Sequence, residues 1–183
     1  MQEFLNWTLK AIRDDNLVNA SWLEEKKFEW TPMVAKSITN IINNGCSVII
    51  LSDTDRKWFL EYIISNINSS KNARPFLPFY DFKSFSKQIK SIQSERDADN
   101  IKDMLNISFP NGYIFWYIGK GQDPIATIAK ISKNSFMWLI DENRQNTFSL
   151  KSDDFLDYKL LQMFKLFNKT LSAALFAQID VNK

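Results

Sequence analysis

The segment Cys46-Ser47-Val48-Ile49-Ile50-Leu51-Ser52-Asp53-Thr54 decides the fold class of this 183-residue chain. Its first six residues are almost wholly apolar, which is typical of a strand that is covered on both faces. The polar residues 52–54 end this strand and supply caps for a helix that contains Trp58, Phe59, Tyr62, Ile63 and Ile67. A strand, a short polar turn and a helix form the first half of a βαβ unit, so the segment predicts a parallel sheet.

Four further segments predict strands of the same sheet. They lie at 74–80, 112–119, 135–140 and 147–150. Pro78 cannot donate to a ladder, so the first should be an edge strand or contain a bulge, and 147–150 should form the other edge. Helices are expected between the strands, at about 82–92, 98–105 and 124–131. We therefore expect one α/β domain over 1–183, with a mostly parallel five-stranded sheet between helical layers in a flavodoxin-like strand order.

Two amphipathic helices are expected before the first strand, at 3–18 and 31–44. In the second, Thr31 is a natural N-cap, Pro32 sits at the first helical position and Gly45 ends the helix. Between the two helices, a short polar segment carries three aromatic residues, which form either a lid over the core or an exposed partner surface. These residues are Trp22, Phe28 and Trp30.

The last predicted helix, about 153–178, has apolar residues over most of its circumference. A helix on the surface of a monomer needs only one apolar stripe. One face should therefore pack on the sheet and another on a second subunit, which predicts an oligomer. The alternative is a central helix that is fully buried within one chain.

Composition argues against an enzyme, because the chain has no His, one Cys and four Gly. It excludes catalytic triads with His, imidazole metal sites and a Gly-rich nucleotide loop, so we expect no metal and no cofactor. The lone Cys46 cannot form an internal disulfide, which favours a reducing compartment. No apolar run approaches the roughly 20 residues needed to span a bilayer, and the first residues do not resemble a signal peptide. We expect a cytoplasmic protein that does not bind membranes.

A crevice is expected where the strand order reverses, at the carboxyl ends of the central strands. Ser52, Thr54 and Lys120 would line it, and hydroxyls at a helix N-terminus suit phosphate. Asp53 and Asp55 place negative charge in the same position, and capping explains the hydroxyls without a ligand. The crevice therefore leaves a phosphosugar-binding protein, either an isomerase-like enzyme or a sensor, as the alternative function.

Two other groups of charged residues have ordinary structural explanations. The carboxylate pairs at 24–25 and 153–154 could serve acid–base chemistry, but adjacent helix residues do not share a face. A basic stripe could follow a nucleic-acid backbone, but a solvated helix face is the simpler interpretation. It consists of Lys83, Lys87 and Lys90.

Taken in order, several stretches resemble the HobA family, the DnaA-binding proteins of epsilonproteobacterial replication initiation. They are 52–66 (SDTDRKWFLEYIISN), Arg74-Pro75 leading to Asp81-Phe82, 115–120 (FWYIGK), 135–139 (SFMWL) and 157–167 (DYKLLQMFKLF). Trp7 and residues 21–24 fit as well, so the resemblance covers essentially the whole chain, apart from 83–106 and the tail after Phe176.

The resemblance implies a sugar-isomerase-like (SIS) α/β fold without isomerase activity, assembled as a homotetramer that is a dimer of dimers. It implies a scaffold that binds the N-terminal domain of the DnaA initiator and gathers several copies at the chromosomal origin, contacting DNA only through DnaA. The positions that would take part in binding are Phe148, Ser152, Asp153 and Phe176. A helix from 153 to 176 is about 35 Å long, so two antiparallel helices across a two-fold axis would be needed to bring both ends to one partner.

Overall fold

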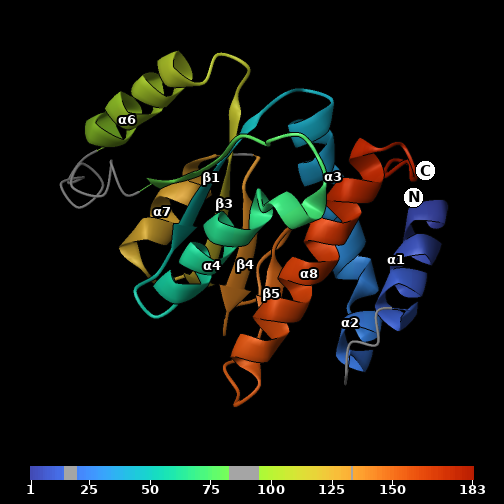
Figure 1. Cartoon of the computed structure of the whole chain (residues 1–183). Helices are drawn as coiled ribbons and strands as arrows, with labels where there is room; N and C mark the ends of the chain where they lie inside the picture. The colour runs from blue at the N-terminus through green and yellow to red at the C-terminus, as the bar shows by residue number, and fades with distance from the viewer. Residues whose placement is uncertain (15–19, 83–94, 133) are drawn as a thin grey trace.

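The computed structural model describes residues 1–14, 20–82, 95–132 and 134–183, and its sheet has the strand order β2-β1-β3-β4-β5 (Figure 1). The strands are β1 (Ser47–Ser52), β2 (Phe79–Asp81), β3 (Tyr113–Lys120), β4 (Phe136–Ile140) and β5 (Phe148–Leu150). Every neighbouring pair of strands is parallel. The five-stranded sheet, its parallel direction and the flavodoxin-like order are therefore confirmed.

Helices cover both faces of the sheet, so the molecule has three layers (Figure 1). One face is covered by α1 (Gln2–Asp14), α3 (Lys27–Ile42), α4 (Lys57–Ile67) and α8 (Leu156–Leu175). The other face is covered by α6 (Glu95–Ser108) and α7 (Pro124–Ile131). Successive residues of β3 show the alternation, because Trp116 belongs to the apolar cluster under α8 and Tyr117 to the cluster under α7.

The last helix, α8, is buried on several sides within a single chain. It contacts α1, α3 and α4, and its inner face lies on the sheet, where the rings of Phe167 and Trp116 are 4.8 Å apart. On the flank towards α4, the rings of Phe164 and Tyr62 are 5.5 Å apart. Packing inside one chain thus accounts for most of the apolar circumference, which was the alternative to a second subunit. The sequence pattern of α8 does not by itself require an oligomer.

The structure corrects the predicted start of the second helix. The helix α3 begins at Lys27, so Thr31 lies inside it and donates its hydroxyl to the Lys27 carbonyl at 2.6 Å, and Pro32 also lies inside the helix. Thr31 is therefore not an N-cap. The additional turn places Trp30 in the core with no exposed surface, and this burial outweighs the hydrogen bond that Pro32 removes.

Trp22, Phe28 and Trp30 do not lie in a segment between helices, where the sequence placed them. They lie in α3 and in a short helix, α2 (Ser21–Glu25). Trp30 is buried, Trp22 is half-buried and Phe28 is exposed. The group is thus divided between the core and the surface, and neither of the two alternatives describes all three residues.

Pro78 precedes the edge strand rather than lying within it. The strand β2 is at the edge as predicted, and the Pro78 carbonyl accepts a hydrogen bond from Val48 N at 2.8 Å. A short 3-10 helix, η1 (Ser70–Asn72), lies between α4 and β2. Most of the helix predicted at 82–92, together with the basic residues Lys83, Lys87 and Lys90, falls outside the described residues. So do the last residues of the first predicted helix, including Leu17.

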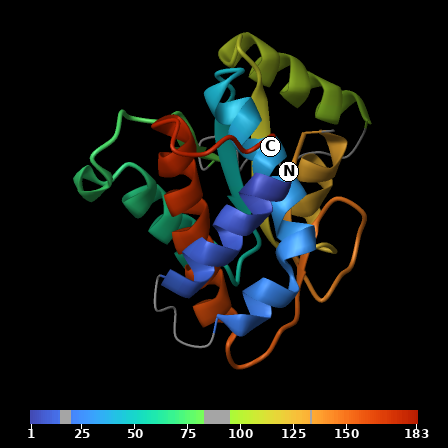
Figure 2. The ribbon, with the colours of Figure 1, turned by 90° about the vertical axis from the view of Figure 1, so that its right-hand side faces the viewer.

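The two ends of the chain lie next to each other (Figure 2). The Met1 ammonium donates to the Asn182 carbonyl at 3.1 Å, and Glu3 N donates to the Lys183 carbonyl at 3.2 Å. Residues after α8 therefore reach the start of α1, and Val181 is buried among them.

Candidate functional site

The predicted crevice at the carboxyl ends of β1 and β3 is filled by side chains of the chain itself. Ser52 pairs with Ile118 in the sheet, so the residues that follow β1 meet the end of β3. Asp53 turns inward and is only 5% exposed. Its Oδ2 accepts a hydrogen bond from the backbone N of Lys120 at 2.8 Å. This bond ties the end of β3 to the turn after β1.

Arg56 completes the filling of this crevice. Its backbone N and its Nε donate to Asp53 Oδ1 at 3.0 and 2.8 Å, and a terminal guanidinium nitrogen donates to Asp53 Oδ2. Arg56 is itself only 7% exposed. Burial disfavours its charge, but the hydrogen bonds and charge of Asp53, with the charge of Asp55, raise the pKa of the guanidinium above its ordinary value. A buried, multiply bonded ion pair thus lies at the strand ends.

Because Gly119 has no Cβ, the Asp53 carboxyl group can occupy the space next to it. Its φ is +152°, and a Cβ at this position would lie 2.6 Å from Asp53 Cγ and 2.8 Å from Tyr117 Oη. The Tyr117 hydroxyl donates to the Lys120 carbonyl at 2.7 Å. Burial, together with the nearby charge of Asp53, raises the pKa of Tyr117 well above its ordinary value. The absence of a side chain at 119 is thus a requirement of the ion pair, not of a bound phosphate.

The residues predicted to line a ligand crevice lie around this ion pair. Ser52 is buried, while Thr54 and Lys120 are exposed at the rim. The predicted capping role also shifts, because α4 has Arg56 at its N-cap and Asp53 accepts the Arg56 backbone N–H. Two backbone donors that a phosphate would need are already bonded to Asp53. Among the described residues, no cluster of His, Cys, Asp or Glu could hold a metal ion.

Three of the predicted partner-binding residues are exposed at the two ends of α8. Ser152 and Asp153 precede its start, and Phe176 is its C-cap and is 50% exposed. Asp153 forms an ion pair with Lys159 and accepts Phe155 N at 3.0 Å. The hydrogen bond from Lys159 is the main cause that lowers the pKa of Asp153. The helix between these ends is about 30 Å long at 1.5 Å per residue.

The fourth predicted partner-binding residue, Phe148, does not lie on the surface of the chain. Its side chain has no exposed surface, because α3 covers β5. Its ring packs at 5.6 Å from Trp30 and at 6.4 Å from Trp22. The strand β5 is at the edge of the sheet as predicted, but this side chain points inward and belongs to the core. Phe148 therefore supports Trp22, whose Nε1 donates to Gln162 Oε1 of α8 at 2.8 Å.

Sequence reasoning missed a group of exposed aromatic residues on α4 and the first turns of α8. Each is more than a third exposed: Trp58, Tyr62, Phe155 and Tyr158. They escaped notice because helical periodicity identifies apolar residues on a helix but not where its buried face ends. We call these four residues the aromatic surface.

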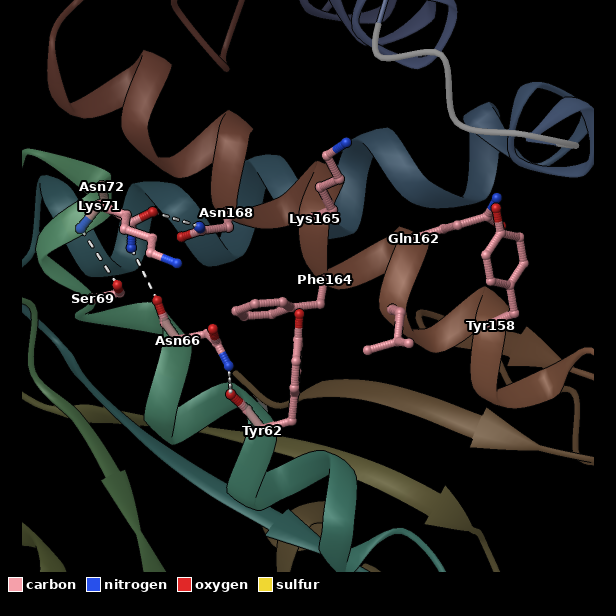
Figure 3. A pocket seen from close by; sticks show the side chains of 11 residues that line it. Tyr62, Asn66, Ser69, Lys71, Asn72, Tyr158, Gln162, Phe164, Lys165 and Asn168 are labelled. Atoms are coloured by element: carbon pink, nitrogen blue, oxygen red, sulfur yellow. Dashed lines mark hydrogen bonds between the residues drawn. The ribbon is translucent and has the colours of Figure 1, made fainter.

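A pocket of about 410 Å³ lies between α4 and α8 beside the aromatic surface (Figure 3). Tyr62 and Phe164 line its floor, Tyr158 stands at one end, and Lys71 lies at the other end with Asn72. Polar side chains gather at the Lys71 end of this groove, while aromatic rings lie in its middle and at the Tyr158 end.

Arg74 holds together the end of the groove at which Lys71 and Asn72 lie. Its guanidinium donates to Asn168 Oδ1 at 2.6 Å, to Ser172 Oγ at 2.7 Å and to the Ile67 carbonyl at 2.6 Å. Burial lowers the pKa of Arg74 to about 10. Asn168 Nδ2 in turn donates to Asn72 Oδ1 at 3.0 Å. This network fixes the loop after α4 against the second half of α8.

These features define an α/β protein of flavodoxin-like strand order, whose strand-end crevice holds an internal ion pair and whose exposed aromatic residues line two neighbouring helices. The chain belongs to the HobA family of DNA replication regulators, because the model of that family matches residues 1–181. The resemblance seen in the sequence is thereby confirmed.

Among the known proteins that are similar to this chain are one relative and two solved structures from Helicobacter pylori. The DNA replication regulator protein HobA of strain ATCC 700392 / 26695 is 32% identical over 187 residues, which cover 99% of this chain and all of the relative. A crystal structure of HobA matches with a TM-score of 0.74 at 32% identity, covering 98% of each chain. A HobA–DnaA (domain I–II) complex matches with a TM-score of 0.71 at 32% identity, covering 98% of this chain and 99% of the other.

Within the described parts of the chain, no helix is both long and apolar enough to cross a bilayer.

Proposed function

We propose that this protein is a non-enzymatic scaffold that binds the N-terminal domain of the DnaA initiator and promotes its assembly at the chromosomal origin. One observation carries the proposal: the chain matches, over nearly its full length, a HobA chain that was crystallised with DnaA domain I–II. Contact with DNA would be indirect, through DnaA. A protein with this role works at the chromosome, so we place it in the cytoplasm.

The filled crevice supports a role without catalysis. Asp53 already accepts the backbone N–H groups of Arg56 and Lys120, which a phosphosugar would otherwise use. With no His in the sequence, general acid–base chemistry would also lack its usual residue. No observation favours the alternative, a phosphosugar-binding enzyme or sensor.

The position of the predicted contacts supports a binding site made by two subunits. Ser152 and Asp153 lie about 30 Å from Phe176 along α8, which is too far for one small domain to contact both ends on one chain. Two α8 helices that pack antiparallel across a two-fold axis would bring the start of one close to the end of the other. A dimer would then have two equivalent sites, and a tetramer built as a dimer of dimers would have four.

In such an assembly, exposed aromatic residues would form the contact surface. Phe155 is the N-cap of α8 and Tyr158 lies in its first turn. The groove next to them continues towards the middle of α8. Buried aromatic anchors supply most of the free energy in many protein interfaces. Tethering several initiators to one tetramer would raise their local concentration without any new contact between them.

The proposal is tested with Phe176→Ala, by pull-down of the DnaA N-terminal domain and size-exclusion chromatography with light scattering. We expect the variant to remain a tetramer and to lose capture of DnaA. Ile107→Ala is the matched control, because Ile107 is more exposed and lies on α6, across the sheet from α8. Capture by Phe176→Ala equal to that of the control would refute a role for this end of α8.

The two-subunit site is tested separately with Tyr158→Asp, which places a charge on the exposed part of α8. If this variant is monomeric, we expect its affinity for the DnaA domain to fall with the loss of the dimer. A monomer that binds DnaA with unchanged affinity would contradict the two-subunit site, while leaving DnaA binding itself intact.

A further inference from the structure

Three groups of hydrogen-bond donors converge on the Asp53 carboxylate. They are the backbone N of Arg56 before α4, the Arg56 guanidinium, and the backbone N of Lys120 at the end of β3. The donors come from two separate elements of the fold. Backbone N–H groups and a guanidinium are the groups by which proteins hold carboxylates and phosphates. The geometry around Asp53 is therefore that of an anion site with an anion in place.

The anion in this site belongs to the chain, and the surroundings are built to enclose it. Asp53 and Arg56 are each more than nine-tenths buried. Gly119 has no Cβ, which would otherwise lie 2.6 Å from the Asp53 carboxyl carbon. The exposed neighbour Asp55 lies 3.5 Å from the same guanidinium, but outside the enclosure. The loop thus contains one enclosed carboxylate and one solvated carboxylate beside a single arginine.

We infer that the strand-end crevice is an anion-binding cradle that the chain fills with its own Asp53. In the native protein the cradle takes no external ligand. Without the Asp53 carboxyl group, it becomes a site for small carboxylates, of which formate has the size of the group removed. This inference goes beyond DnaA binding, since the cradle is made by residues at the ends of β1 and β3 and by Arg56, not by the α8 residues that the proposed function uses.

The test is chemical rescue of Asp53→Ala by sodium formate, followed by thermal unfolding. Removal of one partner from a buried pair should lower the Tm by about 10 °C. Formate at about 0.1 M should then raise the Tm of the variant by about 3 °C in a saturable way, because the ligand binds only the folded state. Sodium chloride at equal ionic strength corrects for screening.

Asp55→Ala is the matched control, since it removes a carboxylate of the same loop that is exposed. The control and the native protein should show no formate response beyond that of chloride. A response of Asp53→Ala no larger than that of Asp55→Ala would overturn the inference and reduce the pair to an ordinary salt bridge.

Asp53→Ser provides a second variant if Asp53→Ala does not fold. The serine hydroxyl can accept the Arg56 N–H in a local turn while leaving room for formate. We expect the same saturable rise in Tm. Absence of a formate response in Asp53→Ser, with Asp53→Ala remaining unfolded in formate, would also overturn the inference.

Discussion

The crevice at the strand ends buries charged groups, whereas the outer surface of α4 and α8 exposes large aromatic side chains. In the crevice, Asp53 and Arg56 are buried and bonded to each other, and the nearby backbone donors are used. On the helices, Phe155 is 67% exposed and Tyr158 43% exposed, although both are large apolar side chains. The fold places its natural ligand position in the first region, but the groups available for a partner lie in the second.

The contrast between the two regions would fail most clearly if the Asp53–Arg56 ion pair could be removed without loss of stability. Arg56→Met removes one side of a buried pair and leaves the Asp53 charge uncompensated. We expect the free energy of unfolding to fall by about 3–5 kcal/mol, measured by urea denaturation. Arg13→Met is the control, because the ion pair of Arg13 with Glu24 at 2.7 Å is solvent-exposed, and its loss should change stability little. Equal stability of the two variants would contradict the account of a buried pair.

The next largest effect is expected from a substitution that tests whether the crevice can accommodate an additional methyl group. Gly119→Ala would place a Cβ against the Asp53 carboxyl group and in an unfavourable backbone conformation. We expect a loss of about 3 kcal/mol in urea denaturation, from strain and from displacement of the ion pair. Gly45→Ala also has a positive φ but meets no atom closer than 3.6 Å, so it should cost only about 1 kcal/mol.

On the helical surface, substitution should affect association rather than folding. Tyr158→Ala removes an exposed ring, so the free energy of unfolding at a fixed low protein concentration should change by less than about 1 kcal/mol. Affinity for the DnaA domain or for the second subunit should fall about tenfold, as measured by calorimetry and sedimentation. Loss of stability with association unchanged would make Tyr158 a core residue and remove the contrast between the two regions.

The smallest effect is a pH dependence at the start of α8. Lys159 lowers the pKa of Asp153 in the folded protein, so this carboxylate contributes stability above its unfolded pKa of about 4. The contribution disappears as the pH falls through the lower folded value. Since the pair is well solvated, Asp153→Asn should remove only a few tenths of a kcal/mol near pH 7 and nothing near pH 2. Urea denaturation across this range measures the difference, and Asp154→Asn controls for a charge removed from the adjacent residue.

Patterns confined to short stretches predicted the sheet well. The apolar segment predicted at 46–51 and the helix predicted from Pro124 appear in the structure as β1 (Ser47–Ser52) and α7, because burial on both faces and an N-terminal proline leave clear sequence patterns. Thr31 and Pro32 gave the wrong helix start because their local preference for that position was weaker than the burial of Trp30, the residue just before them.

The site depended on contacts that no local pattern contains. Asp53 and Lys120 are 67 positions apart, and only the register of β1 with β3 brings them together. Phe148 lies on the edge strand that the sequence predicted, but the sequence did not reveal that α3, from a distant part of the chain, covers this strand. The apolar circumference of α8 likewise could not reveal that α1, α3 and α4 of the same chain would surround it.

Calorimetric titration of the DnaA N-terminal domain tests most directly whether binding resides on α8 rather than in the crevice. The variants are Phe176→Ala at the helix end and Thr54→Ala and Lys120→Ala at the exposed crevice rim. The account predicts that Phe176→Ala weakens binding at least tenfold, roughly 1.4 kcal/mol, while both rim variants bind like the native protein. Unchanged binding by Phe176→Ala together with weakened binding by the rim variants would contradict it.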